Sequence, residues 1–308
     1  MSDAPRAPGW LARADQPREF RLTLCGGRDA ENSLAELRGA LDGLAMGVGW
    51  RPGELAWCLD VDCAPAEAWS VLQRLRERLA DADVYLQPRD ELGKRLLICD
   101  MDMTIVAAET LDEVAASLGL GEKIASITRR AMHGELDFRA ALRERIAMLA
   151  GQPEQVFHDI VDKLELNPGA ESLLAGARAA GVHTILVSGG FEQVARPVAE
   201  RLGFDEVYCN RLEIDRGRLT GGVPEPIVDA GLKRDILERQ SAALGIPLAQ
   251  CCAIGDGAND LPMLAAAGLG IAYRGKPVLR DATPCRIDHS GLDAALHFMG
   301  LDLPGQGS

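Results

Sequence analysis

Residues 96–110, "LLICDMDMTIVAAET", constrain the fold of this chain more than any other stretch. Leu96 to Cys99 form an unbroken apolar run, which is typical of a strand buried on both faces of a parallel sheet. Asp100 and Asp102 follow, and on an extended chain their side chains would leave the same side. Such close carboxylates repel each other unless a cation lies between them or one of them holds a proton. A solvated loop with acidic caps is the alternative, and the rest of the chain argues against it.

The chain after about residue 91 alternates strand-like and helix-like segments, which indicates an α/β fold with a Rossmann-like parallel sheet. Strands are expected at 95–100, 183–188, 206–209, 251–256 and 269–273. Helices are expected at 169–180, 191–202, 232–244 and 260–267. A hairpin is predicted within 212–223, around Arg216 and Gly217. We expect this α/β domain to cover residues 91–308.

The segment between the first two strands, about 107–165, looks wholly helical. Thr110 and Glu113 have the spacing of a capping box at the start of its first helix. An all-helical insertion directly after a strand that ends in two carboxylates predicts a helical cap, closing over a site as a lid.

Residues 1–90 follow a different pattern, in which a loose leader precedes a small α+β domain. Its strands are expected at 20–26, 54–63 and 82–87, with one more near 48–51, and its helices at 29–45 and 65–80. Asp60 and Asp62 repeat the Asp-x-Asp spacing, but no phosphate-binding pattern follows them. We interpret them as polar residues on an exposed strand face.

Composition narrows the partners of the chain. A formal net charge of −13 disfavours nucleic acid and anionic membranes, because both bind basic surfaces. No apolar run is long enough to cross a membrane, and the first residues lack a signal-peptide core. The eight cysteines have no metal-ligand spacing and mostly lie in apolar runs, which favours a reducing cytoplasm. The sequence leaves the oligomeric state open, a homodimer included.

Polar residues at the expected strand ends suggest one reaction class, because ligands of open α/β sheets bind at the carboxyl ends of the strands. These residues are Asp100, Asp102, Ser188 with Gly189, Asp256, Asn259 and Asp260, together with Lys233 near a helix start. Carboxylates suit Mg²⁺, while a lysine and backbone N–H groups suit phosphate oxygens. The set predicts phosphoryl transfer. The alternatives for single residues are helix capping by Asn259 or Asp260 and a surface position for Lys233.

The segments "DMDMT" (100–104), "VSGG" (187–190), Lys233 and "GDGAND" (255–260), in that order, resemble the four motifs of the haloacid dehalogenase-like (HAD) hydrolase superfamily. The resemblance covers about residues 93–288. The finer resemblance is to the phosphoserine phosphatases, and residues 1–90 are similar to the ACT-like domain of some members. The resemblance implies Mg²⁺-dependent hydrolysis of O-phospho-L-serine, the last step of serine biosynthesis.

The resemblance also implies roles for individual residues. Asp100 would be the nucleophile that forms an aspartyl-phosphate, and Asp102 the acid that protonates the leaving oxygen and then the base that activates water. Mg²⁺ would bind the carboxylates of Asp100 and Asp256 and the backbone carbonyl of Asp102. The residues that would hold or support the phosphoryl and metal shells are Ser188, Gly189, Lys233, Asn259, Asp260 and Thr104.

Substrate selectivity is expected in the helical cap. By resemblance, Glu109 binds the substrate ammonium, Arg145 its carboxylate, and Met132 and Phe138 form apolar walls. Spacing alone does not separate Arg145 from Arg139 and Arg143, or Glu109 from Asp112 and Glu113. Met103 departs from the Ser or Thr usual in the family, and we expect little effect because its side chain should point away from Asp102.

Two other functions remain open from the sequence. One is transfer of the phosphoryl group to an alcohol, or hydrolysis of another small phosphomonoester. The other is a non-catalytic amino-acid sensor built on residues 1–90, against which the intact Asp100, Asp102, Lys233 and Asp256 argue.

Overall fold

The computed structural model describes residues 11, 17–26, 45–46, 51–52, 56–132 and 135–301, with the backbone alone at 45–46, 51–52, 56–57 and 132. Its centre is a six-stranded sheet of order β13-β12-β11-β6-β7-β8, in which every neighbouring pair is parallel. The strands are β6 (Leu96–Asp100), β7 (His183–Phe191), β8 (Glu206–Asn210), β11 (Cys251–Gly255), β12 (Leu269–Tyr273) and β13 (Cys285–Ile287). The predicted α/β fold with a parallel sheet is confirmed, and β13 is a strand that the sequence analysis missed.

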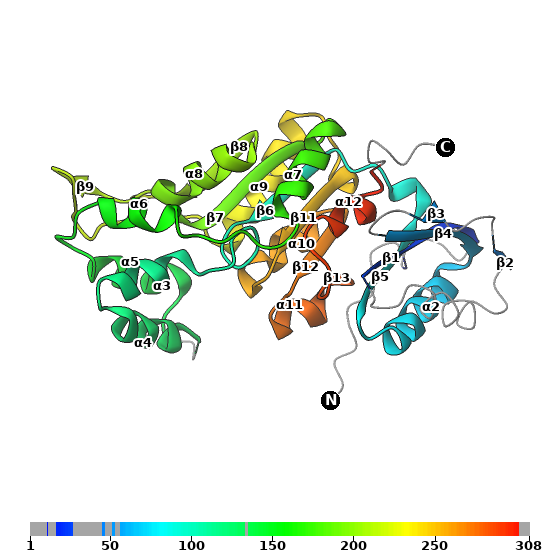
Figure 1. Ribbon diagram of the computed structural model, residues 1–308, viewed down its shortest axis with the longest axis horizontal. Coiled ribbons are helices and arrows are strands. Elements are labelled where there is room, and N and C mark those ends of the chain that lie inside the picture. The colour runs from blue at the N-terminus through cyan, green and yellow to red at the C-terminus, as the bar shows by residue number, and fades with distance from the viewer. Residues whose placement is uncertain are drawn as a thin grey trace.

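Helices cover both faces of this sheet (Figure 1). They are α7 (Ala170–Ala179), α8 (Glu192–Leu202), α9 (Ala230–Ala243), α10 (Leu261–Ala266), α11 (Pro277–Ala282) and α12 (Ala294–Met299). Leu96 and Ile98 pack in the core beneath α9 and α10, whereas Leu97 and Cys99 belong to the core that contains α7, α8 and α12. The apolar run of β6 is therefore buried on both faces, as its sequence predicts.

A helical insertion follows β6 and lies at one end of the sheet (Figure 1). Its helices are α3 (Thr110–Ser117), α4 (Gly121–Met132), α5 (Phe138–Ala147) and α6 (Gln155–Val161). The predicted hairpin, formed by β9 (Ile214–Asp215) and β10 (Arg218–Leu219), packs on it, and the Gly151 amide donates to the Leu219 carbonyl at 2.8 Å.

The prediction of a capping box formed by Thr110 and Glu113 is wrong. Glu109 is the N-cap residue of α3, its side chain makes no cap hydrogen bond, and Thr110 is already helical. The Thr110 amide donates instead to Asp102 Oδ1 at 3.1 Å. The start of α3 is therefore tied to the end of β6 and not capped locally.

The amino-terminal part forms an antiparallel sheet of order β2-β4-β1-β5, with β3 also paired to β4. Its elements are β1 (Arg18–Gly26), β2 (Ala45–Met46), β3 (Arg51–Pro52), β4 (Ala56–Cys63), α2 (Pro65–Arg78) and β5 (Ala82–Pro88). The helix expected at 29–45 lies outside the described residues except Ala45, which belongs to a strand. Residues 48–50 of the extra strand expected near 48–51 also lie outside them.

Side chains of β5 join this part to the carboxyl-terminal segment of the chain. Asp83 accepts hydrogen bonds from three consecutive backbone amides, those of Asp288 (2.7 Å), His289 (3.2 Å) and Ser290 (2.7 Å). The ring of Tyr85 meets that of Phe298 edge-on at 6.1 Å between centroids. A carboxylate held by backbone N–H groups is a strong, charge-assisted contact.

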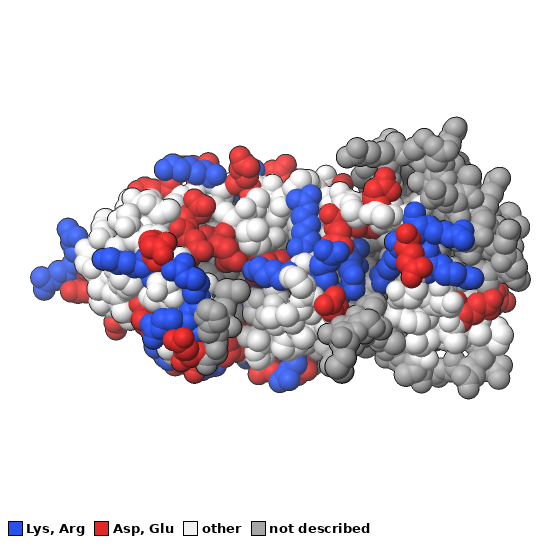
Figure 2. All heavy atoms as spheres, turned by 90° about the horizontal axis from the view of Figure 1, so that it is seen from below, with Lys and Arg blue, Asp and Glu red and all other residues white. Residues whose placement is uncertain are grey.

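On the face seen in Figure 2, acidic and basic side chains lie interspersed. Within the described part of the chain, every helix is too short or too polar to cross a bilayer.

Candidate active site

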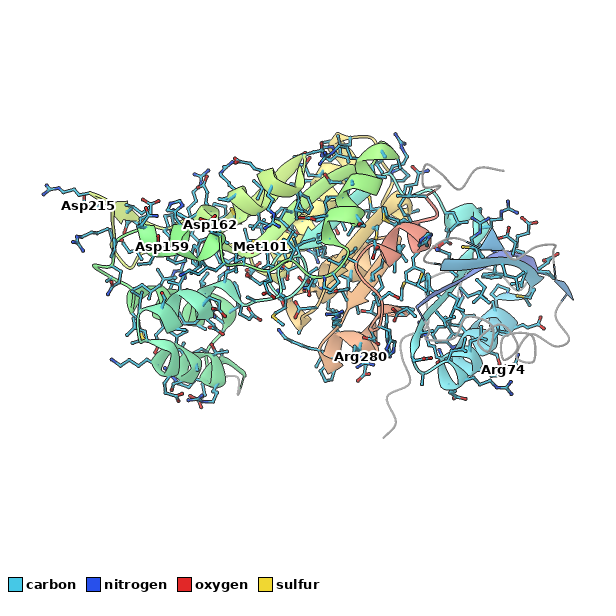
Figure 3. The ribbon with its side chains drawn as sticks, in the orientation of Figure 1. Arg74, Met101, Asp159, Asp162, Asp215 and Arg280 are labelled. Atoms are coloured by element: carbon cyan, nitrogen blue, oxygen red, sulfur yellow. The ribbon has the colours of Figure 1, made fainter. Side chains whose placement is uncertain are left out.

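The end of β6 turns sharply after Asp100, at the end of the sheet nearest the helical insertion, where Figure 3 labels Met101. The amides of Thr104 and Ile105 both donate to the Met101 carbonyl, at 3.3 and 2.8 Å. The strand therefore ends at Asp100, and Asp102 belongs to the turn that follows it. Met103 completes the turn with φ 56°, a left-handed conformation uncommon outside glycine.

Lys233 lies at the centre of the strand-end residues. Its Nζ donates to Asp100 Oδ1 at 2.6 Å and to Asp260 Oδ1 at 2.7 Å, and all three side chains are buried. Burial alone would lower the pKa of Lys233, but the two carboxylates raise it above its usual value. The alternative of a surface lysine is therefore wrong, and the buried ammonium stays charged.

Three buried carboxylates meet at the carboxyl end of the sheet. One oxygen from each of Asp100, Asp256 and Asp260 lies within 4.8 Å of the other two. Burial, followed by repulsion from Asp260, raises the pKa of Asp100 well above its usual range, while Lys233 acts in the opposite direction. A hard cation with oxygen ligands fits this donor set, because Mg²⁺ favours carboxylates and would offset their mutual repulsion.

Asp260 forms hydrogen bonds to several groups of the site. Its Oδ2 accepts the backbone amides of Asp256 at 3.2 Å and Gly257 at 3.1 Å, while its Oδ1 receives Lys233. Asp260 stands at the N-cap position of α10, yet its side chain makes no cap hydrogen bond there. Asn259 lies beside it, with Nδ2 3.5 Å from Asp260 Oδ1. Asp260 therefore orients the loop after β11, and capping alone does not describe it.

Asp102 is close enough to Asp100 and Lys233 to interact electrostatically with both, but its hydrogen-bond partners are different. Oδ1 accepts the Thr110 amide, and Oδ2 lies 3.5 Å from the Ser188 hydroxyl. Burial raises the pKa of Asp102 to about 6. A carboxyl with this pKa can hold a proton near neutral pH and also give it up, as an acid and base in one reaction must.

Ser188 and Gly189 form the second side of the site. Ser188 is fully buried in β7, and its Oγ accepts the Gly190 amide at 2.8 Å. Asn210 Nδ2 donates to the Gly189 carbonyl at 2.7 Å, which fixes the peptide between Gly189 and Gly190. β7 continues through both glycines to Phe191, so the strand does not end at Ser188 as expected, and the hydroxyl-and-glycine cradle stays a prediction.

The three arginines of α5 have different partners. Arg139 pairs with Asp229 and Glu225, and Arg143 pairs with Glu225. Among the described residues, Arg145 forms no ion pair within 4.0 Å, and its Nε only approaches the Ala141 carbonyl at 3.4 Å.

Arg145 nevertheless has acidic residues around it. Burial lowers its pKa, while Asp112, Glu109 and Asp102 act in the opposite direction. Glu109 is half-exposed and contacts Lys276 at 3.3 Å. Arg145 and Glu109 therefore lie in one region beside Asp102. This position favours Arg145 over Arg139 and Arg143, a choice that spacing alone left open.

Phe138 reaches across from the insertion to the phosphate side. A Cβ placed on Gly189 would lie 3.3 Å from Phe138 Cζ, so the ring covers that glycine. The side chain of Met132 lies outside the described residues. Thr104 is buried in the turn after β6, and its hydroxyl has no partner among the described atoms.

Three polar residues near the site were missed by the sequence analysis. Asn167 donates from Nδ2 to the carbonyls of Thr104 (2.8 Å) and Met103 (3.2 Å), and Asn210 donates to the Gly189 carbonyl. Lys276 contacts Asp256 Oδ2 at 3.1 Å. A polar residue ending the expected strand 206–209 was the available signal for Asn210, whereas loop residues such as Asn167 and Lys276 carry none.

The chain belongs to the haloacid dehalogenase-like hydrolase family, whose model matches residues 97–265. Within that class it is similar to phosphoserine phosphatases. One from Mycobacterium tuberculosis is 44% identical over 208 residues, covering 68% of this chain and 51% of that protein. The chain thus spans about half the length of that relative and of a Streptomyces coelicolor phosphoserine phosphatase.

Solved structures extend the similarity to nearly the whole chain. A HAD family hydrolase from Salmonella enterica serovar Typhi superposes with a TM-score of 0.83 at 31% identity, covering 91% of this chain and 98% of that one. A phospho-aspartyl intermediate analogue of phosphoserine phosphatase superposes with a TM-score of 0.63 at 35% identity, covering 67% of this chain and 99% of that one.

Proposed function

We propose that this protein is a Mg²⁺-dependent phosphatase that hydrolyses O-phospho-L-serine to L-serine and phosphate. The observation that carries the proposal is Lys233, buried between Asp100 and Asp260 beside a three-carboxylate cluster. A buried cation next to a carboxylate at a strand end removes the repulsion that a dianionic phosphate would otherwise meet. The similarity to phosphoserine phosphatases supports the substrate.

In the first half of the reaction, Asp100 attacks phosphorus and the bond between phosphorus and the serine oxygen breaks. Asp102 donates its proton to the departing oxygen, which a carboxyl with a pKa of about 6 can do near neutral pH. The product is an aspartyl-phosphate on Asp100, and a phospho-aspartyl intermediate analogue of the similar phosphatase supports this step. Lys233, Ser188 and the amides after it hold the phosphoryl oxygens.

In the second half, the ionised Asp102 takes a proton from water, and the resulting hydroxide attacks phosphorus. Phosphate leaves, and Asp100 is regenerated as a carboxylate. When bound at Asp100, Asp256 and the Asp102 carbonyl, Mg²⁺ supplies positive charge beside the transferring group. Asp260 orients the loop that carries Asp256 through its two backbone hydrogen bonds.

The helical insertion supplies selectivity in this proposal and acts as the lid. Arg145, without an ion pair among the described side chains, binds the substrate carboxylate, and Glu109 binds the ammonium. Phe138 and Met132 wall the space between them. We assign residues 1–90 to an ACT-like domain and 91–308 to the phosphatase domain, and we place the reaction in serine biosynthesis in the cytoplasm.

The test is phosphate release from a panel of phosphomonoesters with and without Mg²⁺, for the parent and for Asp100→Asn. We expect phosphoserine to be the best substrate, a strict Mg²⁺ requirement, and loss of several orders of magnitude in turnover in the variant. Near-parental turnover in Asp100→Asn, with deamidation excluded by mass spectrometry, would contradict the nucleophile. Phosphate release that requires an added alcohol would indicate transfer instead of hydrolysis.

A further inference from the structure

Lys276 is a cation that joins the two sides of the site. Its Nζ lies 3.1 Å from Asp256 Oδ2 and 3.3 Å from Glu109 Oε1. Asp256 is one of the three clustered carboxylates at the sheet end, and Glu109 is the N-cap residue of α3, where the helical insertion begins. One ammonium thus connects a proposed metal ligand with the proposed ligand of the substrate ammonium.

The backbone fixes Lys276 at this place. β12 ends at Tyr273, and Arg274 then adopts φ 44°, in the left-handed region, where the chain bends. The Lys276 amide donates to the Asp256 carbonyl at 2.8 Å, so the residue is anchored to the very residue that its side chain contacts. Its carbonyl accepts the Arg280 amide at 3.0 Å and starts α11.

The side chain, by contrast, is free to change partners. It is 57% exposed, whereas the Asp256 side chain is 8% exposed and that of Glu109 50%. Ion pairs of exposed lysines are weak because water screens them, so an incoming cation can displace this one. A long, flexible lysine stem also lets the ammonium move into solvent while the backbone stays bound.

We propose that Lys276 is a resident cation that competes with the divalent metal for Asp256 and with the substrate ammonium for Glu109. This inference rests on the proposed function and adds a residue that sets how tightly each of the two cations binds. Before they bind, the lysine partly neutralises a strongly acidic site and ties the helical insertion to the sheet. When they bind, its ammonium has to leave both carboxylates.

The first test measures Mg²⁺ affinity without substrate, by calorimetric titration of MgCl₂ into the full-length protein freed of divalent ions. Lys276→Gln should lower the Mg²⁺ dissociation constant roughly three- to tenfold, because a competing positive charge is removed. Lys276→Arg keeps the charge and should restore the parental value. Lys123→Gln makes the same charge change on the exposed face of α4, with no ion pair within the described residues, and should match the parent.

The outcomes separate this inference from the function on which it rests. Equal Mg²⁺ dissociation constants for Lys276→Gln and the parent would overturn the competition while leaving the metal site intact. Weaker binding by Lys276→Gln would also overturn it, because the lysine would then orient Asp256 for the metal. Failure of the parent to bind Mg²⁺ would overturn the proposed metal site and the inference together.

The second test concerns Glu109 and compares phosphoserine with a phosphorylated hydroxy acid of the same length that has no ammonium. Lys276→Gln should lower the KM for phosphoserine relative to that for the second substrate, because only phosphoserine displaces the lysine from Glu109. An equal change in both KM values would show that Lys276 acts on the phosphate or on folding, and would overturn this half of the proposal.

Discussion

Lys233 Nζ lies 2.6 Å from Asp100 Oδ1, in a buried ion pair between residues 133 positions apart in the sequence. The second carboxylate, Asp260, holds the same ammonium from another side. The cluster therefore has a fixed charge balance before any ligand arrives. Removing one member leaves the others uncompensated, which costs more than an exposed pair would.

Lys233→Met should lower the free energy of unfolding by about 3–5 kcal/mol, because two buried carboxylates lose their cation. Turnover should fall by orders of magnitude in the same variant. Urea denaturation and phosphate release measure the two effects. The double variant Lys233→Met/Asp260→Asn should be more stable than the single one, since one uncompensated charge is removed with the lysine. Equal instability of the single and double variants would contradict the charge argument.

Gly255→Ala should displace Asp260. A Cβ at position 255 would lie 2.5 Å from Asp260 Cγ, closer than real contacts allow. The carboxylate would move off the amides of Asp256 and Gly257, so we expect weaker Mg²⁺ binding and a lower melting temperature. Gly121→Ala is the control, because its Cβ would only approach Ala116 Cα at 3.8 Å. Unchanged Mg²⁺ affinity in Gly255→Ala would show that Asp260 does not position Asp256.

Arg145→Ala should weaken phosphoserine binding by roughly 2–5 kcal/mol, part of it from the substrate carboxylate left unpaired. Arg145→Lys should rescue only partly, because an ammonium cannot form the bidentate fork. Steady-state kinetics with phosphoserine and a simple alkyl phosphate measure the selectivity. Arg143→Ala is the matched control, since its half-exposed pair with Glu225 predicts an effect of no more than about 1 kcal/mol. Parallel losses for both substrates in Arg145→Ala would place Arg145 in folding of the insertion.

His297 should make the fold sensitive to acid. It is buried in α12, its Nε2 has no hydrogen-bond partner among the described atoms, and burial lowers its pKa against the effect of Asp293. The unfolded chain therefore binds a proton first as the pH falls below about 6.5, and the folded state loses stability from there down. Relative to His297→Leu, the parent should lose up to about 1.4 kcal/mol more per pH unit in that range. Identical pH slopes in urea denaturation would contradict this prediction.

Asp83→Ala should loosen the amino-terminal part from the rest of the chain. Three amides lose a charged acceptor, so we expect the free energy of unfolding to fall by about 2–4 kcal/mol. Hydrogen exchange at residues 288–290 should rise at the same time. Asp90→Ala removes a carboxylate from an exposed pair with Arg18 and should cost less than about 1 kcal/mol. Unchanged exchange at 288–290 in Asp83→Ala would show that other contacts hold the junction.

Local patterns predicted the sheet and the strand-end residues well. The run from Leu96 to Cys99 is apolar at every position, as a strand buried on both faces requires. The hairpin around Arg216 and Gly217 was also predicted, from the alternating pattern of residues 212–223, and both residues adopt the left-handed conformation in its turn.

Contacts between side chains from different segments could not be predicted from local sequence patterns. Thr110 and Glu113 fit a capping box, but the nearby Asp102 carboxylate took the Thr110 amide instead. Lys233 was expected to bind phosphate, but spacing alone left a surface position open, because the two carboxylates that contact it come from distant segments. The choice of Arg145 over its neighbours likewise depends on Glu225, which lies about 80 residues away in the sequence. The spacing of residues predicts a helix or strand, whereas the partner of a side chain depends on how helices and strands pack together.

Asp83 contacts the main chain of residues 288–290 and not their side chains. Recognition of this kind does not depend on which amino acids occupy those three positions. As far as the contacts of Asp83 are concerned, all three positions accept other residues that keep the N–H, although the Asp288 side chain also pairs with Arg280 at 3.1 Å. Proline alone removes that group, so it is the substitution that this junction cannot accept at any of the three.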